Sequence, residues 1–176
     1  MLIDTLRIPQ ADKLWDVARV PEAIHLGLAT PADIGTYIGR KGPRQGLYYT
    51  QAARVLRLVD DDPVSGRLVL TPYGRTFLRF DRLNQRQGLR RLLREHEPTR
   101  SVLLALKARG GLNWDDVARI LQGLAPLATS TAYRRARTAA AWLCAAGLAS
   151  WEDGALRYNE PRPPATMHRR NDARRA

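Results

Sequence analysis

Apolar residues in the first half of the chain recur at helical spacing between clear start and stop signals. Residues 11–28 indicate a helix interrupted or restarted at Pro21. Thr30-Pro31 pairs a capping threonine with a proline at the first helical position, and Gly39 is a typical stop. Residues 44–56 resume helical spacing, and residues 58–59 and 67–71 favour two short strands joined by a turn-rich loop. This order of helices and hairpin predicts a winged helix-turn-helix domain over residues 1–81.

The second half repeats that order. A long helix over residues 82–97 leads to a helix that starts at Pro98-Thr99 and ends at Gly110-Gly111. Asn113 caps the next helix, which runs to Gly123, and a short linker leads to a helix from residue 129. Residues 148–151 and 155–158 favour a hairpin. We therefore expect a mainly α protein with short β-hairpins: a second winged-helix domain with a basic linking helix over residues 82–160, and a disordered basic tail over residues 161–176.

The two halves match at individual positions. The expected inward positions of the first half are Ile34, Ile38, Tyr49, Ala52, Ala53 and Leu56. By this interpretation Ile34 corresponds to Val117, Ile38 to Leu121, and Tyr49 to either Tyr133 or Ala136.

The segment 129–143 carries the strongest functional pattern. It opens with hydroxyl residues suited to an N-cap, continues with Arg134, Arg135 and Arg137, and becomes apolar towards Trp142. A helix that is cationic at its start and apolar at its end is typical of a recognition helix, whose first turns face bases and phosphates. An ordinary amphipathic surface helix would show much of the same pattern. The choice between a recognition helix and a surface helix therefore depends on the rest of the sequence.

Two stretches resemble a known family. The end of the first unit, Leu-Thr-Pro-Tyr-Gly-Arg-Thr-Phe-Leu at residues 70–78 after the Leu-Val hairpin strand, resembles the end of bacterial winged-helix domains. The resemblance covers roughly residues 30–80. Ser-Thr-Ala-Tyr-Arg-Arg-Ala-Arg at 130–137, followed by Trp142-Leu143, resembles the second unit of the same family. Such domains serve as DNA-binding modules, some attached to restriction–modification components, which implies a DNA-binding role here.

Composition narrows the class of protein. A hydrophobic content of 44% is enough for a core, so global disorder is not expected. No apolar run approaches the roughly 20 residues of a membrane span, and because Asp4 comes before any apolar stretch we expect no signal peptide. The only cysteine, Cys144, excludes an intrachain disulfide. We expect a cytoplasmic, nucleoid-associated bacterial protein.

Positive charge is concentrated in particular segments. The net charge is +12, and 26 of the 29 basic residues are arginine, because only three are lysine. Residues 82–110 hold eight basic and two acidic residues, and residues 161–176 hold five and one. Arginine suits bidentate phosphate and base recognition, although a GC-rich genome also favours arginine codons. Arg82, Arg86, Arg90 and Arg94 recur every fourth position and predict a cationic stripe, for which a solvated face is the alternative.

Signals for catalysis are weak. The chain has no glycine-rich phosphate loop and no nucleophile elbow beside a histidine. The carboxylates of Asp60, Asp61 and Asp62 fall in a hairpin loop, where such groups are usually solvated rather than metal-bound. We expect no enzymatic activity, no cofactor and no metal site.

The predicted function is therefore binding of double-stranded DNA by two winged-helix domains, as a transcriptional regulator or a DNA-targeting module. We expect no membrane partner, and a homodimer is possible. Alternatives are a protein-interaction adaptor of a chromosome-organising complex, and a replication initiator. The candidate DNA-binding residues lie on the two recognition helices, the turn before the first of them and the stripe: Arg40, Lys41, Arg44, Gln45, Tyr48, Gln51, Arg86, Arg90, Arg94, Ser130, Thr131, Arg134, Arg135, Arg137 and Thr138.

Overall fold

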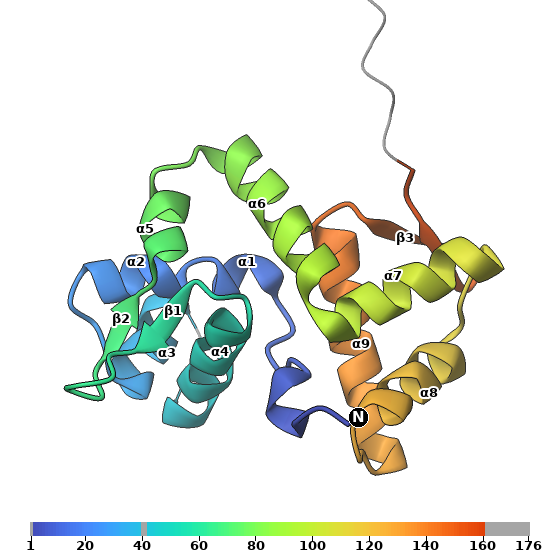
Figure 1. The fold of residues 1–176 in the computed structure, drawn as a ribbon, viewed down its shortest axis with the longest axis horizontal. Coiled ribbons are helices and arrows are strands. Elements are labelled where there is room, and N and C mark those ends of the chain that lie inside the picture. Colours follow the sequence, from blue (N-terminus) through green and yellow to red (C-terminus); the bar gives the residue numbers. More distant parts are fainter. Residues whose placement is uncertain (1, 40–41, 161–176) are drawn as a thin grey trace, which may run out of the picture.

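The computed structural model describes residues 2–39 and 42–160, and these form a mainly helical fold with two small antiparallel hairpins, as the sequence predicts (Figure 1). The basic tail expected over residues 161–176 lies outside the described residues. After a 3-10 turn at Thr5–Arg7, the elements are α1 (Leu14–Val17), α2 (Val20–His25), α3 (Pro31–Tyr37), α4 (Pro43–Val55), β1 (Val59–Asp61), β2 (Leu68–Leu70), α5 (Pro72–Leu78), α6 (Arg82–Glu95), α7 (Glu97–Arg109), α8 (Trp114–Leu124), α9 (Thr129–Ala145), β3 (Ala149–Glu152) and β4 (Ala155–Tyr158).

The first helical unit consists of α2, α3 and α4 followed by the β1–β2 hairpin. Helices α3 and α4 pack so closely that a Cβ atom at Gly46 would lie 1.7 Å from the carbonyl oxygen of Pro31. Only glycine fits at that crossing. The hairpin pairs Val59 with Leu70, and α5 begins directly after β2, with Thr71 accepting the Gly74 N–H as its N-cap.

The second unit has the same order, α7, α8, α9 and the β3–β4 hairpin, with one addition. Leu112, between α7 and α8, exchanges both backbone hydrogen bonds with Leu156 of β4, at 3.0 and 2.8 Å. It therefore acts as a one-residue third strand beside the hairpin. The hairpin turns at Asp153 and Gly154, both with positive φ, which is the geometry of a two-residue type I′ turn.

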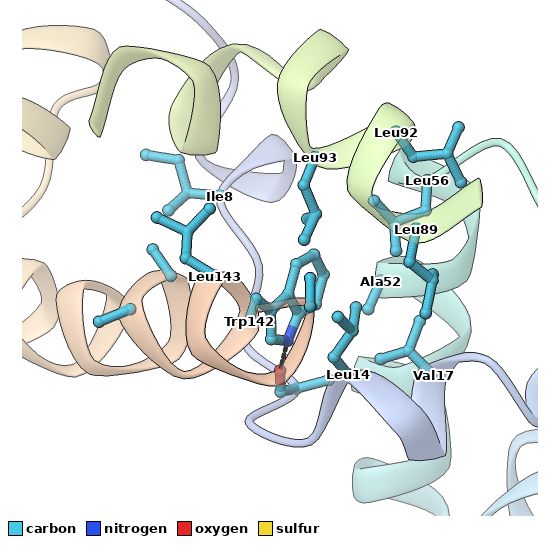
Figure 2. Close-up of a cluster of buried hydrophobic side chains, with 14 of the residues drawn as sticks. Ile8, Leu14, Val17, Ala52, Leu56, Leu89, Leu92, Leu93, Trp142 and Leu143 are labelled. Atoms are coloured by element: carbon cyan, nitrogen blue, oxygen red, sulfur yellow. Dashed lines mark hydrogen bonds between the residues drawn. The ribbon is translucent and has the colours of Figure 1, made fainter. Parts of the chain in front are cut away.

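Helix α6 joins the two units, and the buried residues of both form one continuous hydrophobic cluster. Trp142 of α9 is fully buried near the middle, among side chains that include Leu14 of α1 and Leu93 of α6 (Figure 2). The hydrophobic core is therefore continuous across the domain boundary that the sequence suggests near residue 81.

The segment before α1 also belongs to this shared interior. Three side chains of the second half donate to its backbone carbonyls: His96 Nε2 to Arg7 at 2.8 Å, Arg135 to Ile8 at 2.6 Å and Trp142 to Ala11 at 2.7 Å. Buried carbonyl groups need such partners when no helix or sheet supplies them. The N-terminal residues are therefore held against α9 by polar contacts as well as by apolar burial.

Most expected helix ends are confirmed. The side chains of Thr30 and Asn113 accept backbone N–H groups of their first turns, and Asn113 forms a capping box with Asp116. Gly110 ends α7 in the left-handed conformation. The expected N-cap of α9 is wrong: Ala128 occupies the cap position with no side-chain hydrogen bond, and Thr129 is already helical.

The inward positions are also largely confirmed. Ile34, Ile38, Tyr49, Val117 and Leu121 are all buried. Of the two residues proposed to match Tyr49, Ala136 is buried, whereas Tyr133 is 38% exposed. Tyr133 is therefore a surface residue, and its hydroxyl donates to the carboxylate of Asp115 on α8. Within the described part of the chain, no helix has the length and apolar character needed to cross a membrane.

Candidate nucleic-acid interface

The first two turns of α4 and the second and third turns of α9 face a common cleft of about 610 Å³, here called the α4–α9 cleft. Six of the candidate residues from the sequence line it, three from each helix, together with residues of the N-terminal segment and the end of α3. The lining residues are Gln10, Asp12, Gly39, Arg44, Gln45, Tyr48, Arg134, Arg135 and Thr138. The fold thus brings together side chains that are about ninety residues apart in the sequence.

The α4 side of the cleft is exposed and held by a local contact. Pro43 is the first residue of α4, so Arg44 and Gln45 lie in its first turn, and both are exposed. The Nε of Arg44 donates to the Tyr48 hydroxyl at 2.7 Å, and the guanidinium carbon lies 5.6 Å from the ring centroid. The contact spans one helical turn and fixes Arg44 across the half-buried Tyr48 ring.

The α9 side differs from the sequence-based expectation. Arg135 and Thr138 are among the candidate DNA-binding residues from the sequence, but Arg135 is only 9% exposed and Thr138 only 6%. Arg135 donates to Ile8, and the Thr138 hydroxyl donates to the carbonyl of Arg134 at 3.3 Å. These two residues therefore form the floor of the cleft. The pattern of polar side chains alone could not show that the N-terminal segment covers them.

Besides Thr129 and Ala141, the exposed residues of α9 are Ser130, Tyr133, Arg134 and Arg137. These positions follow helical i, i+3, i+4 and i+7 spacing from Ser130, which is the signal that could have identified Tyr133. Thr131 is half-buried and its hydroxyl lies 3.4 Å from the Arg134 guanidinium. Of the other candidates, Gln51 is half-buried on α4, and Arg40 and Lys41 lie outside the described residues.

Positive charge in the cleft has little compensation. Among the described residues, none of Arg44, Arg134 and Arg135 forms an ion pair with a carboxylate. Burial lowers the pKa of Arg135, and the neighbouring Arg134 charge lowers it further. The Asp12 carboxylate also lines the cleft and accepts the Tyr49 hydroxyl at 2.6 Å. An anion in the cleft would supply the charge that these guanidinium groups lack.

The arginine stripe of α6 lies elsewhere. Arg82, its first member, stacks on Trp15 with 3.2 Å between the guanidinium carbon and the ring centroid, so it is engaged by α1. Arg86, Arg90 and Arg94 line a separate groove with Ala146 and Gly147 at the end of α9. Arg134 and Ala145, the last residue of α9, are about 16 Å apart along the helix at about 1.5 Å per residue. The candidate residues therefore divide between two surfaces.

Of the three aspartates expected in the first hairpin loop, Asp60 and Asp61 belong instead to β1, where they pair with β2, and only Asp62 lies in the loop. Asp61 forms an ion pair with Arg54 at 2.6 Å. The Asp62 carboxylate accepts the backbone N–H groups of Ser65 and Val64 and the Ser65 hydroxyl, and these bonds lower its pKa. Over the described residues, no three or more His, Cys, Asp or Glu side chains are grouped so that they could hold a metal ion.

Comparison with known proteins gives one match. The family model described as a domain of unknown function (DUF7226) matches residues 36–144, which is more than half of the chain and includes α4, α6, α7 and α8 and nearly all of α9. No curated protein matches, and no solved structure matches. The matched region contains the α6 stripe and both helices that line the α4–α9 cleft. Because the match covers more than half of the sequence, the chain belongs to the DUF7226 family.

Proposed function

We propose that this protein binds double-stranded DNA through two winged-helix units, as a transcriptional regulator or a DNA-targeting module. The order of elements supports the winged-helix assignment in each unit: three helices followed by a hairpin. In the second unit Leu112 adds the short strand between the first two helices, paired with β4. In this arrangement α4 and α9 are the third helices, which in helix-turn-helix proteins are the ones that enter the major groove.

The observation that carries the proposal is the convergence of three guanidinium groups from both third helices on the α4–α9 cleft. Arg44, Arg134 and Arg135 lie there without a carboxylate partner among the described residues. Guanidinium groups bind phosphate in a bidentate way, and the cost of holding like charges together is relieved by a polyanion. A duplex is far too wide to enter a cleft of about 610 Å³, so we infer that its backbone lies across the opening.

The position of each exposed side chain indicates how it can contact DNA. Arg44 and Gln45 are exposed in the first turn of α4, and Arg134 and Arg137 are exposed in the second and third turns of α9. From these positions they can reach base edges or phosphates. Arg135 donates a hydrogen bond to the Ile8 carbonyl. It therefore adds to the positive electrostatic potential of the cleft and does not itself read bases. The first hairpin carries Asp60 and Asp61 at its exposed surface, so we do not place it in a groove.

The experiment is a fluorescence anisotropy titration of a labelled duplex of random sequence at about 50 and 200 mM salt. Each phosphate contact contributes about −0.9 to the slope of log K against log salt. Arg44→Ala and Arg134→Ala should each reduce the magnitude of that slope by about 0.9. Arg79→Ala, which removes one exposed charge at the end of α5 and away from the cleft, should have a much smaller effect.

Two results would contradict the proposal. One is the absence of binding at micromolar protein; the other is binding whose affinity does not change with salt. Either result would favour the protein-interaction adaptor. Equal losses for the cleft variants and for Arg79→Ala would show that net charge alone, and not the cleft, attracts the DNA.

A further inference from the structure

A second cationic surface lies along α6 and continues onto α7. The groove beside Arg86, Arg90 and Arg94 has a volume of about 1030 Å³ and is closed on its other side by the end of α9 and by β4 and the residues after it. A smaller adjoining pocket is lined by Arg94, Arg100 and Lys107. Tyr158 of β4 lines both. We call the combined feature the α6 surface.

The cations of the α6 surface lack acidic partners. Five of them line it, and none forms an ion pair within the described residues: Arg86, Arg90, Arg94, Arg100 and Lys107. The Nε of Arg90 is buried and has no hydrogen-bond partner. The carboxylate at the groove is that of Glu160.

Neighbouring arginines on α6 have partners, whereas the arginines of the groove form no ion pair. Arg91, on another face of the same helix, pairs with Glu95 at 2.9 Å. Arg82 is stacked on Trp15. Arg86, Arg90 and Arg94 follow one another at four-residue spacing along the groove, so their like charges repel one another without compensation. A linear polyanion running along the groove would remove that repulsion.

An aromatic ring lies among the charges. Lys107 lies over the Tyr158 ring, with its nitrogen 4.7 Å from the centroid. The ring thus holds the Lys107 ammonium beside the groove, and Lys and Arg side chains are the groups that contact the phosphates of a duplex. The groove is thus suited to a phosphodiester backbone, whose charges are regularly spaced.

The position of the α6 surface determines its role. In Figure 1, α6 starts at the top of the molecule and runs towards its centre, whereas α4 and α9 both begin at the bottom. We propose that the α6 surface is a second binding site for the phosphate backbone of DNA, so that one molecule holds two duplex segments at once. The bridging part of this inference rests on the proposed function, because the first duplex occupies the α4–α9 cleft.

The test is a bridging assay with two duplexes of equal sequence, one immobilised on beads and one fluorescent in solution. Recovery of the fluorescent duplex on the beads reports simultaneous binding, and anisotropy reports binding of one duplex. The α6 variant is Arg86→Ser/Arg94→Ser, which removes two exposed side chains and leaves the half-buried Arg90 in place. Arg86→Lys/Arg94→Lys keeps the charge, and Arg75→Ser/Arg79→Ser, with Arg75 on α5 and Arg79 directly after it, removes the same charge elsewhere.

The wild-type protein should recover the second duplex. The α6 serine variant should lose about tenfold in that recovery at 200 mM salt, because two phosphate contacts are lost, while it still binds one duplex. The lysine variant and the α5 variant should both bridge nearly as well as the wild type. Sedimentation of the free protein identifies any self-association that could bridge DNA by itself.

Three outcomes would overturn the inference. Binding of one duplex without recovery of a second would reject the α6 site and leave the proposed function intact. Bridging that persists in the serine variant would assign it to another surface or to a dimer. Failure of the wild type to bind any duplex would reject both proposals together.

Discussion

The indole N–H of Trp142 donates to the backbone carbonyl of Ala11 at 2.7 Å, although the two residues are 131 positions apart in the chain (Figure 2). Both are buried, Trp142 completely. This bond fixes the N-terminal segment against α9 and thereby sets the position of Gln10 and Asp12 in the α4–α9 cleft. The architecture of the candidate site thus depends on a contact that lies in the core.

Removing the indole should destabilise the protein in two separable steps. Trp142→Phe keeps an aromatic ring but leaves the Ala11 carbonyl without its donor, and we expect a loss of about 1–3 kcal/mol. Trp142→Ala also creates a cavity, and we expect a total loss of about 3–5 kcal/mol. Urea unfolding followed by circular dichroism measures both. A Trp142→Phe variant as stable as the wild type would show that the hydrogen bond contributes nothing.

Arg134 and Arg135 are neighbours with opposite expected effects. Arg135→Ala removes a buried guanidinium from the Ile8 carbonyl and should cost about 1–3 kcal/mol in the free energy of unfolding. Arg134→Ala removes an exposed side chain and should change that free energy by less than about 0.5 kcal/mol, while DNA affinity falls. Thermal melting and anisotropy of both variants separate the two roles. A stable Arg135→Ala variant would contradict the structure of the cleft floor.

His96 should make stability depend on pH. Burial lowers its pKa from 6.5 to about 4, and its Nε2 must carry the proton because it donates to the Arg7 carbonyl. Between these two values the unfolded chain binds more protons than the folded one. Stability is therefore full above about pH 6.5 and falls as the pH drops towards 4, by up to about 3 kcal/mol.

The matched variant is His96→Gln, whose amide can still donate a hydrogen bond but does not titrate. Urea unfolding at intervals between pH 4 and pH 8 gives the two stability curves. The difference between wild type and variant should change through the acidic range and be constant above about pH 7. Parallel curves throughout would show that His96 is not the titrating group.

Two glycines in helices provide a direct test of packing. Gly46→Ala places a methyl group 1.7 Å from the Pro31 carbonyl oxygen, so α3 and α4 must separate. We expect a loss of about 3 kcal/mol or more, and reduced DNA binding because Arg44 and Gln45 move with α4. Gly123→Ala on α8 meets no atom within 4 Å and should be neutral or stabilising by up to about 1 kcal/mol. Similar melting temperatures for the two variants would contradict the close crossing.

Local patterns determined the elements of this protein. Thr30-Pro31, Thr71-Pro72 and Asn113 act through hydrogen bonds within three residues, so the starts of α3, α5 and α8 could be predicted from sequence alone. The same holds for the Asp153-Gly154 turn, and for the four-residue spacing that places Arg86, Arg90 and Arg94 on one face of α6.

Only the tertiary structure decided which of these side chains meet and which are covered. Helical spacing places Arg134, Arg135 and Thr138 on neighbouring faces of α9, but burial of Arg135 comes from the N-terminal segment, more than 120 residues away. Likewise, Trp15 engages Arg82 from α1. The cleft between α4 and α9 arises because two units pack on one core. The spacing of residues within either helix does not determine the distance between the two helices. Contacts between distant segments depend on the shape of the whole fold, whereas caps and turns depend only on their neighbours.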